Sequence, residues 1–211
     1  MTDDDFDRDF WERRWAQALR EHPDAVANRP PNAHLVAAAR DLPPGRALDA
    51  GCGHGAETIW LAARGWRVTA VDFSATALEQ GRSTSEVLGA EVAARVDWIE
   101  ADLGRWQPPA GRFDLVSCLY VHVAGSVGEM VSRLGRGVAP GGTLVLVGHL
   151  PVDPATGEPS PAAGQVQVTV DAAVEVLDTR DWDVVTAEER TRAGGTGADA
   201  VVCARRRHVR G

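Results

Sequence analysis

The sequence predicts an α/β fold in which helices cover both faces of a largely parallel sheet. Apolar runs typical of buried strands alternate with segments of helical period from residue 46 to residue 150. Such alternation is the signature of consecutive βαβ units. A glycine-rich turn at 51–55 joins the first of these strands to the helix that follows it, where ligands bind at the edge of open parallel sheets.

The N-terminal region precedes this alternation. Residues 6–20 place Phe6, Phe10, Trp11 and Trp15 at helical spacing, with charged residues between them. A second short helix is expected at 32–41, before the break "LPPG". We therefore expect residues 1–34 to form a helical cap or lid segment, and residues 35–211 to form the main domain.

The alternating region supplies the predicted sheet and its helices. Ser74 is the expected N-cap of one helix, and Gly65 is expected to end another. The expected strands are 46–50, 66–72, 95–102 and 112–120, followed over 140–150 by a turn at "PGG" and a fifth strand. The expected helices are 55–65, 74–89 and 125–138.

The pattern changes after residue 150. Residues 151–164 form a loop rich in proline and glycine, which is either a mobile gate or plain surface. An extended stretch at 165–170 and a short helix at 170–178 should follow. The last two strands, 181–190 and 198–206, flank "AGGTG" and should pair antiparallel.

Composition excludes several classes of protein. The net charge of −8 argues against a nucleic-acid partner, and no apolar run reaches the length of a membrane span. The acidic start, "MTDDDFDRDF", is unlike a secretory signal, so we expect a cytoplasmic protein. All 22 basic residues are arginine, which excludes a Walker phosphate loop and a pyridoxal Schiff base. The spacing of the Cys and His residues indicates no metal site.

The glycine turn has three interpretations. A tight turn without a ligand is the simplest, and "GCGHGA" also fits the degenerate dinucleotide pattern, with Asp72 about twenty residues further on. Asp49, however, stands at the strand end, where it would repel a pyrophosphate but could hold an ammonium group. Asp102 is placed to accept a hydrogen bond from an adenine amino group. An ammonium group, a ribose and an adenine together describe S-adenosylmethionine.

Several segments, in this order, resemble the class I S-adenosylmethionine-dependent methyltransferases: "LDAGCGHGA", "AVDFS", "EADL", "FDLVSCLYVH" and "APGGTLVLV". The resemblance spans about 35–205 and implies a three-layer Rossmann-like sandwich, whose seven-stranded sheet has an antiparallel last strand. It implies that Asp72 holds the ribose hydroxyls, that Phe73 lines the adenine and that the backbone of 118–120 faces the cofactor. The expected cofactor-binding residues are Asp49, Gly51, Cys52, Gly53, Gly55, Asp72, Phe73, Asp102, Leu103 and Cys118.

The flanking segments resemble a narrower branch, the thiopurine S-methyltransferases and tellurite-resistance methyltransferases. The resemblance lies in "FWERRW", "RGWRVTAVD", the tryptophan of "DLGRW" and "YVH". It implies a soft acceptor atom: sulfur, selenium or tellurium. A thiol is partly ionised near neutral pH and needs no strong base, whereas an alcohol or phenol does.

Candidate catalytic and lid residues lie after the strands and on the N-terminal helix. His122 and Tyr120 are the expected catalytic residues, with His122 as the base if the acceptor is a hydroxyl or amine. His149, after the fifth strand, is the other base available near the site, although we expect it to be a strand-end residue satisfied by backbone. His54 is expected to face solvent or cap a helix. Trp11 is the better lid candidate, whereas Trp15 is expected to pack its helix on the sheet or, as a second lid residue, to cover the substrate.

The sequence therefore predicts a methyltransferase that transfers a methyl group from S-adenosylmethionine to a small molecule and releases S-adenosylhomocysteine. The expected acceptor is a soft nucleophile. A small-metabolite O- or N-methyltransferase using His122 is the first alternative; a nicotinamide-binding protein and a cofactor-binding module without catalysis are the others. We expect a monomer or homodimer without membrane or nucleic-acid partners.

Overall fold

The computed structural model describes residues 8–122, 125–154, 156–160, 164–192 and 197–208. The chain divides into two compact units, residues 2–106 and residues 107–211 with Met1. Residues 6–7 of the expected first helix, and most of the "AGGTG" turn, lie outside the described residues. None of the described helices is long and apolar enough to cross a membrane.

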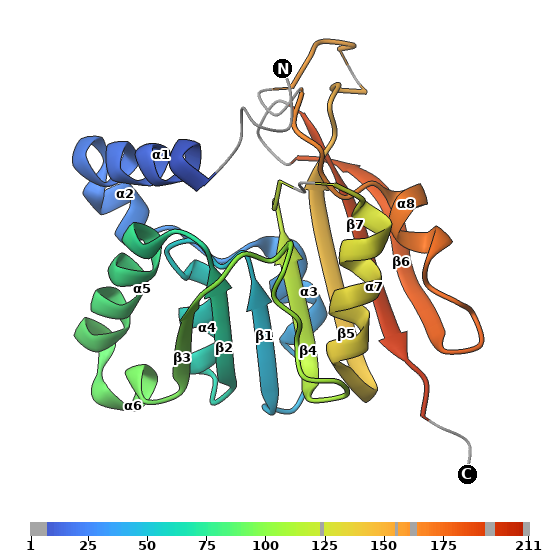
Figure 1. The fold of residues 1–211 in the computed structure, drawn as a ribbon, viewed down its shortest axis with the longest axis horizontal. Coiled ribbons are helices and arrows are strands. Elements are labelled where there is room, and N and C mark those ends of the chain that lie inside the picture. Colours follow the sequence, from blue (N-terminus) through green and yellow to red (C-terminus); the bar gives the residue numbers. More distant parts are fainter. Residues whose placement is uncertain (1–7, 123–124, 155, 161–163, 193–196, 209–211) are drawn as a thin grey trace. The chain divides into compact units, whose positions relative to one another are not determined.

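The first unit contains three helices followed by βα units (Figure 1). Its strands β1, β2 and β3 pair in parallel, with β2 between the other two. Helix α4 packs on these strands, and α5 packs on β2 and β3. The elements are α1 (Arg8–Glu21), α2 (Pro23–Ala27), α3 (Ala33–Ala39), β1 (Arg46–Ala50), α4 (Ala56–Ala63), β2 (Arg67–Asp72), α5 (Ala75–Leu88), α6 (Ala90–Ala93) and β3 (Val96–Glu100).

Local chemistry explains where these helices begin and end. Ser74 caps α5, because its side chain accepts a hydrogen bond from the N–H of Ala77, as predicted. Gly65 follows α4 with a positive φ of 91°, which favours glycine at a helix end. Asn32 caps α3 by accepting from the N–H groups of His34 and Leu35.

The second unit is the C-terminal half of the sheet. Strand β4 pairs in parallel with β5, and β7 pairs antiparallel with both β5 and β6. Helix α7 packs on β4 and β5, and α8 packs on β6 and β7. The elements are β4 (Phe113–Leu119), α7 (Val127–Gly137), β5 (Val138–His149), α8 (Val170–Glu175), β6 (Trp182–Thr191) and β7 (Ala198–Arg206).

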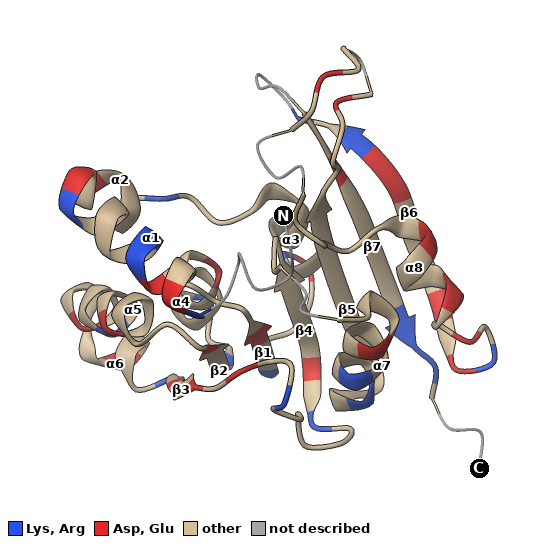
Figure 2. Cartoon of the chain, turned by 45° about the horizontal axis from the view of Figure 1, so that its top comes forward, with Lys and Arg blue, Asp and Glu red and all other residues tan. Residues whose placement is uncertain are grey.

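The sheet order confirms the predicted fold class. The seven strands follow the order β3-β2-β1-β4-β5-β7-β6, and β7 alone runs antiparallel to its neighbours. Strand β5 carries no charged residue, as its uniform tan colour in Figure 2 shows, and is buried from Gly142 to Gly148. Strand β6, at the end of the order, carries acidic and basic residues along its length.

The stretch at 165–170, expected to be extended, belongs to no strand, and Thr169, the N-cap of α8, has extended backbone. One expectation about the elements was wrong. Strand β5 begins at Val138, so "PGG", expected as a turn, belongs to the strand, although Gly141 keeps a φ of 80°. The domain boundary expected at 34/35 stays a prediction.

Candidate functional site

The glycine turn follows β1 in the first unit, and its glycines have left-handed backbone. Gly51, Gly53 and Gly55 have φ values of 75°, 52° and 82°. Side chains of the chain itself also approach this turn. A Cβ on Gly53 would lie 2.7 Å from Cζ2 of Trp15, and a Cβ on Gly55 would lie 2.4 Å from Cη2 of Trp98. Conformation and packing therefore both require glycine at positions 53 and 55.

Four of the five backbone N–H groups of the turn are engaged within the protein. Those of Gly51 and Cys52 donate to the carbonyl of Val71, at 2.8 and 3.1 Å, and that of Gly55 donates to Cys52 at 2.9 Å. The N–H of Gly53 donates to Asp72 Oδ2 at 2.8 Å. A pyrophosphate needs such groups as donors. The turn is therefore poorly suited to the dinucleotide that its glycine pattern allows.

Two buried carboxylates flank the turn. Asp49 is 2% exposed, and its Oδ2 accepts from the hydroxyl of Thr58 at 2.6 Å. Asp72 is 9% exposed, and its Oδ1 accepts from the N–H of Ser74 at 2.9 Å. Burial raises the pKa of Asp72, and backbone hydrogen bonds from Ser74 and Gly53 oppose that rise. Because β1 and β2 are parallel neighbours, both acids stand at the same edge of the sheet.

The other residues expected to bind the cofactor differ in how exposed they are. Asp102 is exposed, and its Oδ1 accepts from the N–H of Gly104 at 2.7 Å, which shapes the turn after β3. Phe73 and Leu103 are half-buried, whereas Cys52 is buried and the pKa of its thiol is raised by burial. Cys118 is buried in β4, in the second unit.

Helix α1 lies against the carboxyl-end edge of β2 and β3. Arg8 pairs with Glu100 at the end of β3, and Glu12 Oε1 accepts from the N–H of Ala75, at the start of α5, at 2.7 Å. Trp15 packs on the glycine turn rather than on the sheet, so the core-packing interpretation of Trp15 was wrong. Trp11 makes an edge-to-face contact with Phe10 instead, with ring centroids 5.4 Å apart.

His54 lies in the glycine turn and is 8% exposed, so the expectation that it faces solvent was wrong. Its ring centroid is 5.2 Å from that of Trp15, and its ring makes a hydrogen bond with the backbone of Val26. Burial, together with the nearby charge of Arg29, lowers its pKa to about 4. His54 is therefore neutral and forms part of the contact between α1 and the turn.

Protonation of His54 should destabilise the protein. The folded-state pKa is lowered, so between pH 6.5 and about 4 the unfolded state binds more protons. The contribution is fully present above about pH 6.5 and falls as the pH decreases, by roughly 2 kcal/mol at about pH 5. Urea unfolding near pH 7.5 and near pH 5 measures it. His54→Gln should flatten this pH dependence, whereas exposed His22→Gln should leave it unchanged; equal slopes in wild type and His54→Gln would contradict the prediction.

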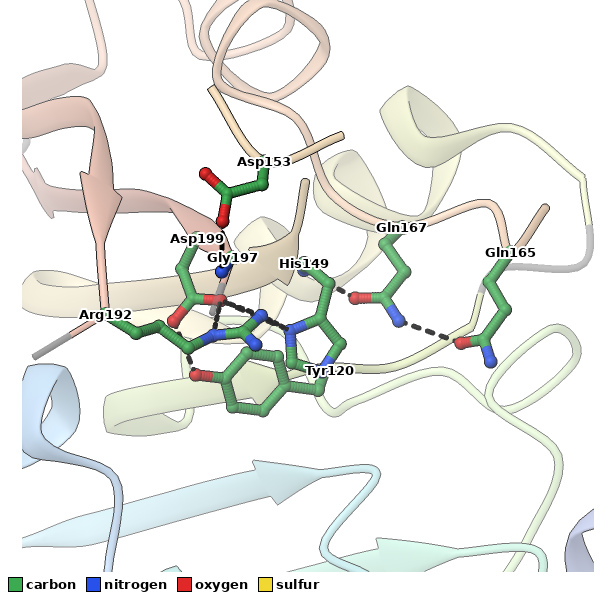
Figure 3. Close-up of polar contacts among 8 residues, drawn as sticks. All are labelled: Tyr120, His149, Asp153, Gln165, Gln167, Arg192, Gly197 and Asp199. Carbon is green, nitrogen blue, oxygen red and sulfur yellow. Dashed lines mark hydrogen bonds and ion pairs between the residues drawn. The ribbon is translucent and has the colours of Figure 1, made fainter. Parts of the chain in front are cut away.

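The second unit carries the predicted catalytic residues at the ends of its strands. His122 Nδ1 accepts a hydrogen bond from the N–H of Val166 at 3.2 Å. Tyr120 has a φ of 57°, the only positive value among the described residues that are not glycine. Its hydroxyl donates to Asp199 at 2.9 Å, and its ring stacks on His149 at 4.1 Å (Figure 3).

The sequence analysis missed the partners of these residues. Asp199 is the second residue of β7 and Arg192 follows β6. Gln167 accepts from the backbone N–H of His149 at 2.7 Å. Side-chain partners so far apart in sequence leave no local pattern. Thr58, Glu12 and Trp98 were missed for the same reason. A cavity of about 690 Å³ between α7 and α8 contains none of the predicted site residues.

The sequence was compared with models of known protein families. Residues 47–142 match the family model described as "Methyltransferase domain". This stretch, 96 of the 211 residues, is therefore similar to a methyltransferase domain.

Two curated relatives are similar in sequence. A probable thiol methyltransferase 2 of Arabidopsis thaliana is 32% identical over 71% of this chain and 65% of its own length. A ubiquinone biosynthesis O-methyltransferase of Xanthomonas campestris is 34% identical over 63% of this chain and 55% of its own. The chain thus spans less than two thirds of either relative.

A solved S-adenosylmethionine-dependent methyltransferase from Mesorhizobium loti is similar in structure. It is 22% identical, with a TM-score of 0.65, over 83% of this chain and 99% of its own. This similarity confirms the fold.

Proposed function

We propose that this protein is an S-adenosylmethionine-dependent methyltransferase that acts on a small molecule with a soft acceptor atom, a thiol above all. The observation that carries the proposal is the pair of buried acids, Asp49 and Asp72, beside a turn in which four backbone N–H groups are already engaged. Such an edge accepts an ammonium group and ribose hydroxyls, but not a pyrophosphate.

The residues present fit S-adenosylmethionine. Asp72 keeps lone pairs beyond those used by Gly53 and Ser74, since a carboxylate has about four acceptor sites, and it can receive both ribose hydroxyls. Asp49, fixed by Thr58, can hold the ammonium group. Phe73, Asp102 and Leu103 follow β2 and β3, where we assign the adenine. When bound, the cofactor supplies a methyl group already activated on a sulfonium sulfur.

The chain's own residues would then align the reactants and exclude water. Orientation of bound reactants can lower a barrier by up to about 7–11 kcal/mol. Helix α1 is suited to this task as a lid. It is attached to the first unit through Arg8, Glu12 and Trp15. Trp11 and Trp15 would contribute aromatic faces, which attract a sulfonium cation by about 0.5–2 kcal/mol.

Two observations support the acceptor class. The thiol methyltransferase relative is similar over most of this chain, and a thiol needs only weak assistance in losing its proton. The O-methyltransferase relative supports the second candidate, methylation of a hydroxyl, for which His122 is the base that the sequence suggests.

Binding and turnover test the proposal separately. We expect calorimetry to show binding of S-adenosylhomocysteine and none of NAD, because two buried carboxylates flank the turn and four of its N–H groups are already engaged. Methyl transfer from labelled cofactor is then measured to a panel of thiol, selenite, tellurite and phenol acceptors. Tight NAD binding with a silent adenosyl ligand would overturn the proposal, and transfer to phenols alone would move it to the second candidate.

A further inference from the structure

Four side chains of the second unit meet at one edge of its strands (Figure 3). Tyr120 follows β4, His149 ends β5, Arg192 follows β6 and Asp199 lies at the start of antiparallel β7. We call these four residues the Asp199 cluster. The carboxyl ends of parallel strands are the edge at which ligands bind in this kind of sheet, so the cluster stands where an acceptor is expected.

Asp199 is the centre of the cluster and is ionised. It is 2% exposed; its Oδ1 accepts from Arg192 Nε and Nη2 at 2.9 and 2.7 Å, and its Oδ2 accepts from the hydroxyl of Tyr120. Burial alone would raise its pKa, but hydrogen bonds from His149, Arg192 and Tyr120 hold the pKa at about 2. A buried, charged carboxylate with several donors is a fixed acceptor.

His149 is held by this carboxylate on one side of its ring. Its Nδ1 lies 3.2 Å from Asp199 Oδ1, and its ring stacks on Tyr120 at an interplanar angle of 23°. The side chain is 28% exposed, and no described residue makes a hydrogen bond to Nε2. One ring nitrogen is therefore fixed, and the other is available to a ligand.

The contacts of Nδ1 imply two different tautomers. Arg192 Nη2 also lies against Nδ1, and because a guanidinium can only donate, that contact needs an unprotonated Nδ1. The contact with Asp199 needs a protonated one. Arg192 already donates twice to Asp199 Oδ1, whereas a carboxylate beside Nδ1 favours a proton there. The Nδ1–H tautomer leaves a bare lone pair on Nε2.

We propose that His149 Nε2 receives the proton of the methyl acceptor and that Asp199 is the positioning residue that sets its tautomer. The acceptor's X–H bond breaks, its proton goes to Nε2, and its electron pair forms the bond to the methyl carbon. The carbon–sulfur bond breaks with its electrons on sulfur, which becomes a neutral thioether. This inference rests on the proposed function and transfers the role of base from His122 to His149.

The surroundings of the two histidines support this assignment. His122 uses Nδ1 to accept a backbone N–H, an interaction that orients the ring without a charge. His149 instead faces Asp199, Arg192 and Tyr120, with the charge of Asp153 acting on Arg192. A base oriented by a third, ionised group is the arrangement that proton-transfer catalysis requires. The acceptor it suits is a thiol or hydroxyl that is still protonated at working pH.

Methylation rates on acceptors of different acidity test the proposal directly. His149→Gln should leave methylation of an aryl thiol, ionised at neutral pH, within about tenfold of wild type. On a phenol, whose pKa is about 10, the loss should reach roughly 10²–10⁴-fold, the usual contribution of a general base, and the loss on an alkyl thiol should lie between these two. The matched control is His208→Gln, an exposed histidine of the same unit beside Gly141. An equal loss on every acceptor, or a larger graded loss for His122→Gln, would overturn the proposal.

A second test needs no turnover. Nitrogen NMR of wild-type protein labelled in its histidines should show His149 as the Nδ1–H tautomer, and Asp199→Asn should remove that preference. An Nε2–H tautomer in the wild type would refute the proposal even if the kinetic result were ambiguous. Calorimetry with S-adenosylhomocysteine on the same samples separates this inference from the proposed function. If the wild type does not bind this ligand, the proposed function is wrong. If it binds but the loss in His149→Gln does not depend on the acidity of the acceptor, only the role of His149 is wrong.

Discussion

Asp72→Ala should weaken binding of S-adenosylhomocysteine by about 10²-fold or more. Hydrogen bonds to a charged acceptor contribute about 1.5–3 kcal/mol each, and two ribose hydroxyls are assigned to this carboxylate. The structure adds a second reason for a large effect, because Asp72 also accepts from the N–H groups of Gly53 and Ser74. Its loss releases the glycine turn from the start of α5. Calorimetry measures the dissociation constant directly.

A matched control separates the cofactor contact from the turn contact. Asp97 lies in the neighbouring strand β3 and is exposed, so Asp97→Ala should change neither binding nor stability appreciably. Thermal unfolding of Asp72→Ala without ligand reports how much the turn alone has lost. An unchanged dissociation constant in a folded Asp72→Ala protein would show that the ribose is held elsewhere.

Gly55→Ala should destabilise the fold by about 2–5 kcal/mol. The left-handed backbone, with a φ of 82°, costs an alanine about 1–2 kcal/mol. The added Cβ would also lie 2.4 Å from Trp98 Cη2, and overpacking of this kind costs about 1–3 kcal/mol. Urea unfolding at neutral pH measures the sum.

Gly111→Ala is the control for this prediction. Gly111 has a φ of 60°, but a Cβ there would meet nothing within 4 Å, so its substitution carries the backbone cost alone. The difference between the two variants is the steric contribution of Trp98. Equal destabilisation of the two variants would contradict the prediction. It would mean that Trp98 moves aside at no cost and that its packing against the turn does not contribute to stability.

Much of the first unit could be predicted from its sequence because its signals are local. The strand of 46–50, the cap at Ser74 and the glycine after α4 each depend on residues within a few positions of one another. Helices α2 and α6 were not predicted, because four or five residues are too few to show a period. The acids at the ends of β1 and β2 were found because parallel strands bring such positions to one edge.

The partners in the second unit could not be predicted in the same way. Tyr120 and Asp199 are 79 positions apart, and only the register of β5 and β7 brings His149 opposite Asp199. His149 was expected to be satisfied by backbone; Gln167 does bind its N–H, but the ring is held by a carboxylate. His54 was misplaced because sequence gives no sign that Trp15 covers the turn.

Tyr120 offers a way to observe the Asp199 cluster directly. It is the only tyrosine in the chain. Its hydroxyl donates to Asp199, and its ring stacks on the ring of His149. Biosynthetic replacement of tyrosine by a fluorinated analogue would therefore put a single fluorine nucleus into the Asp199 cluster. One resonance, free of overlap, would then report acceptor binding and proton movement at that edge of the sheet in solution.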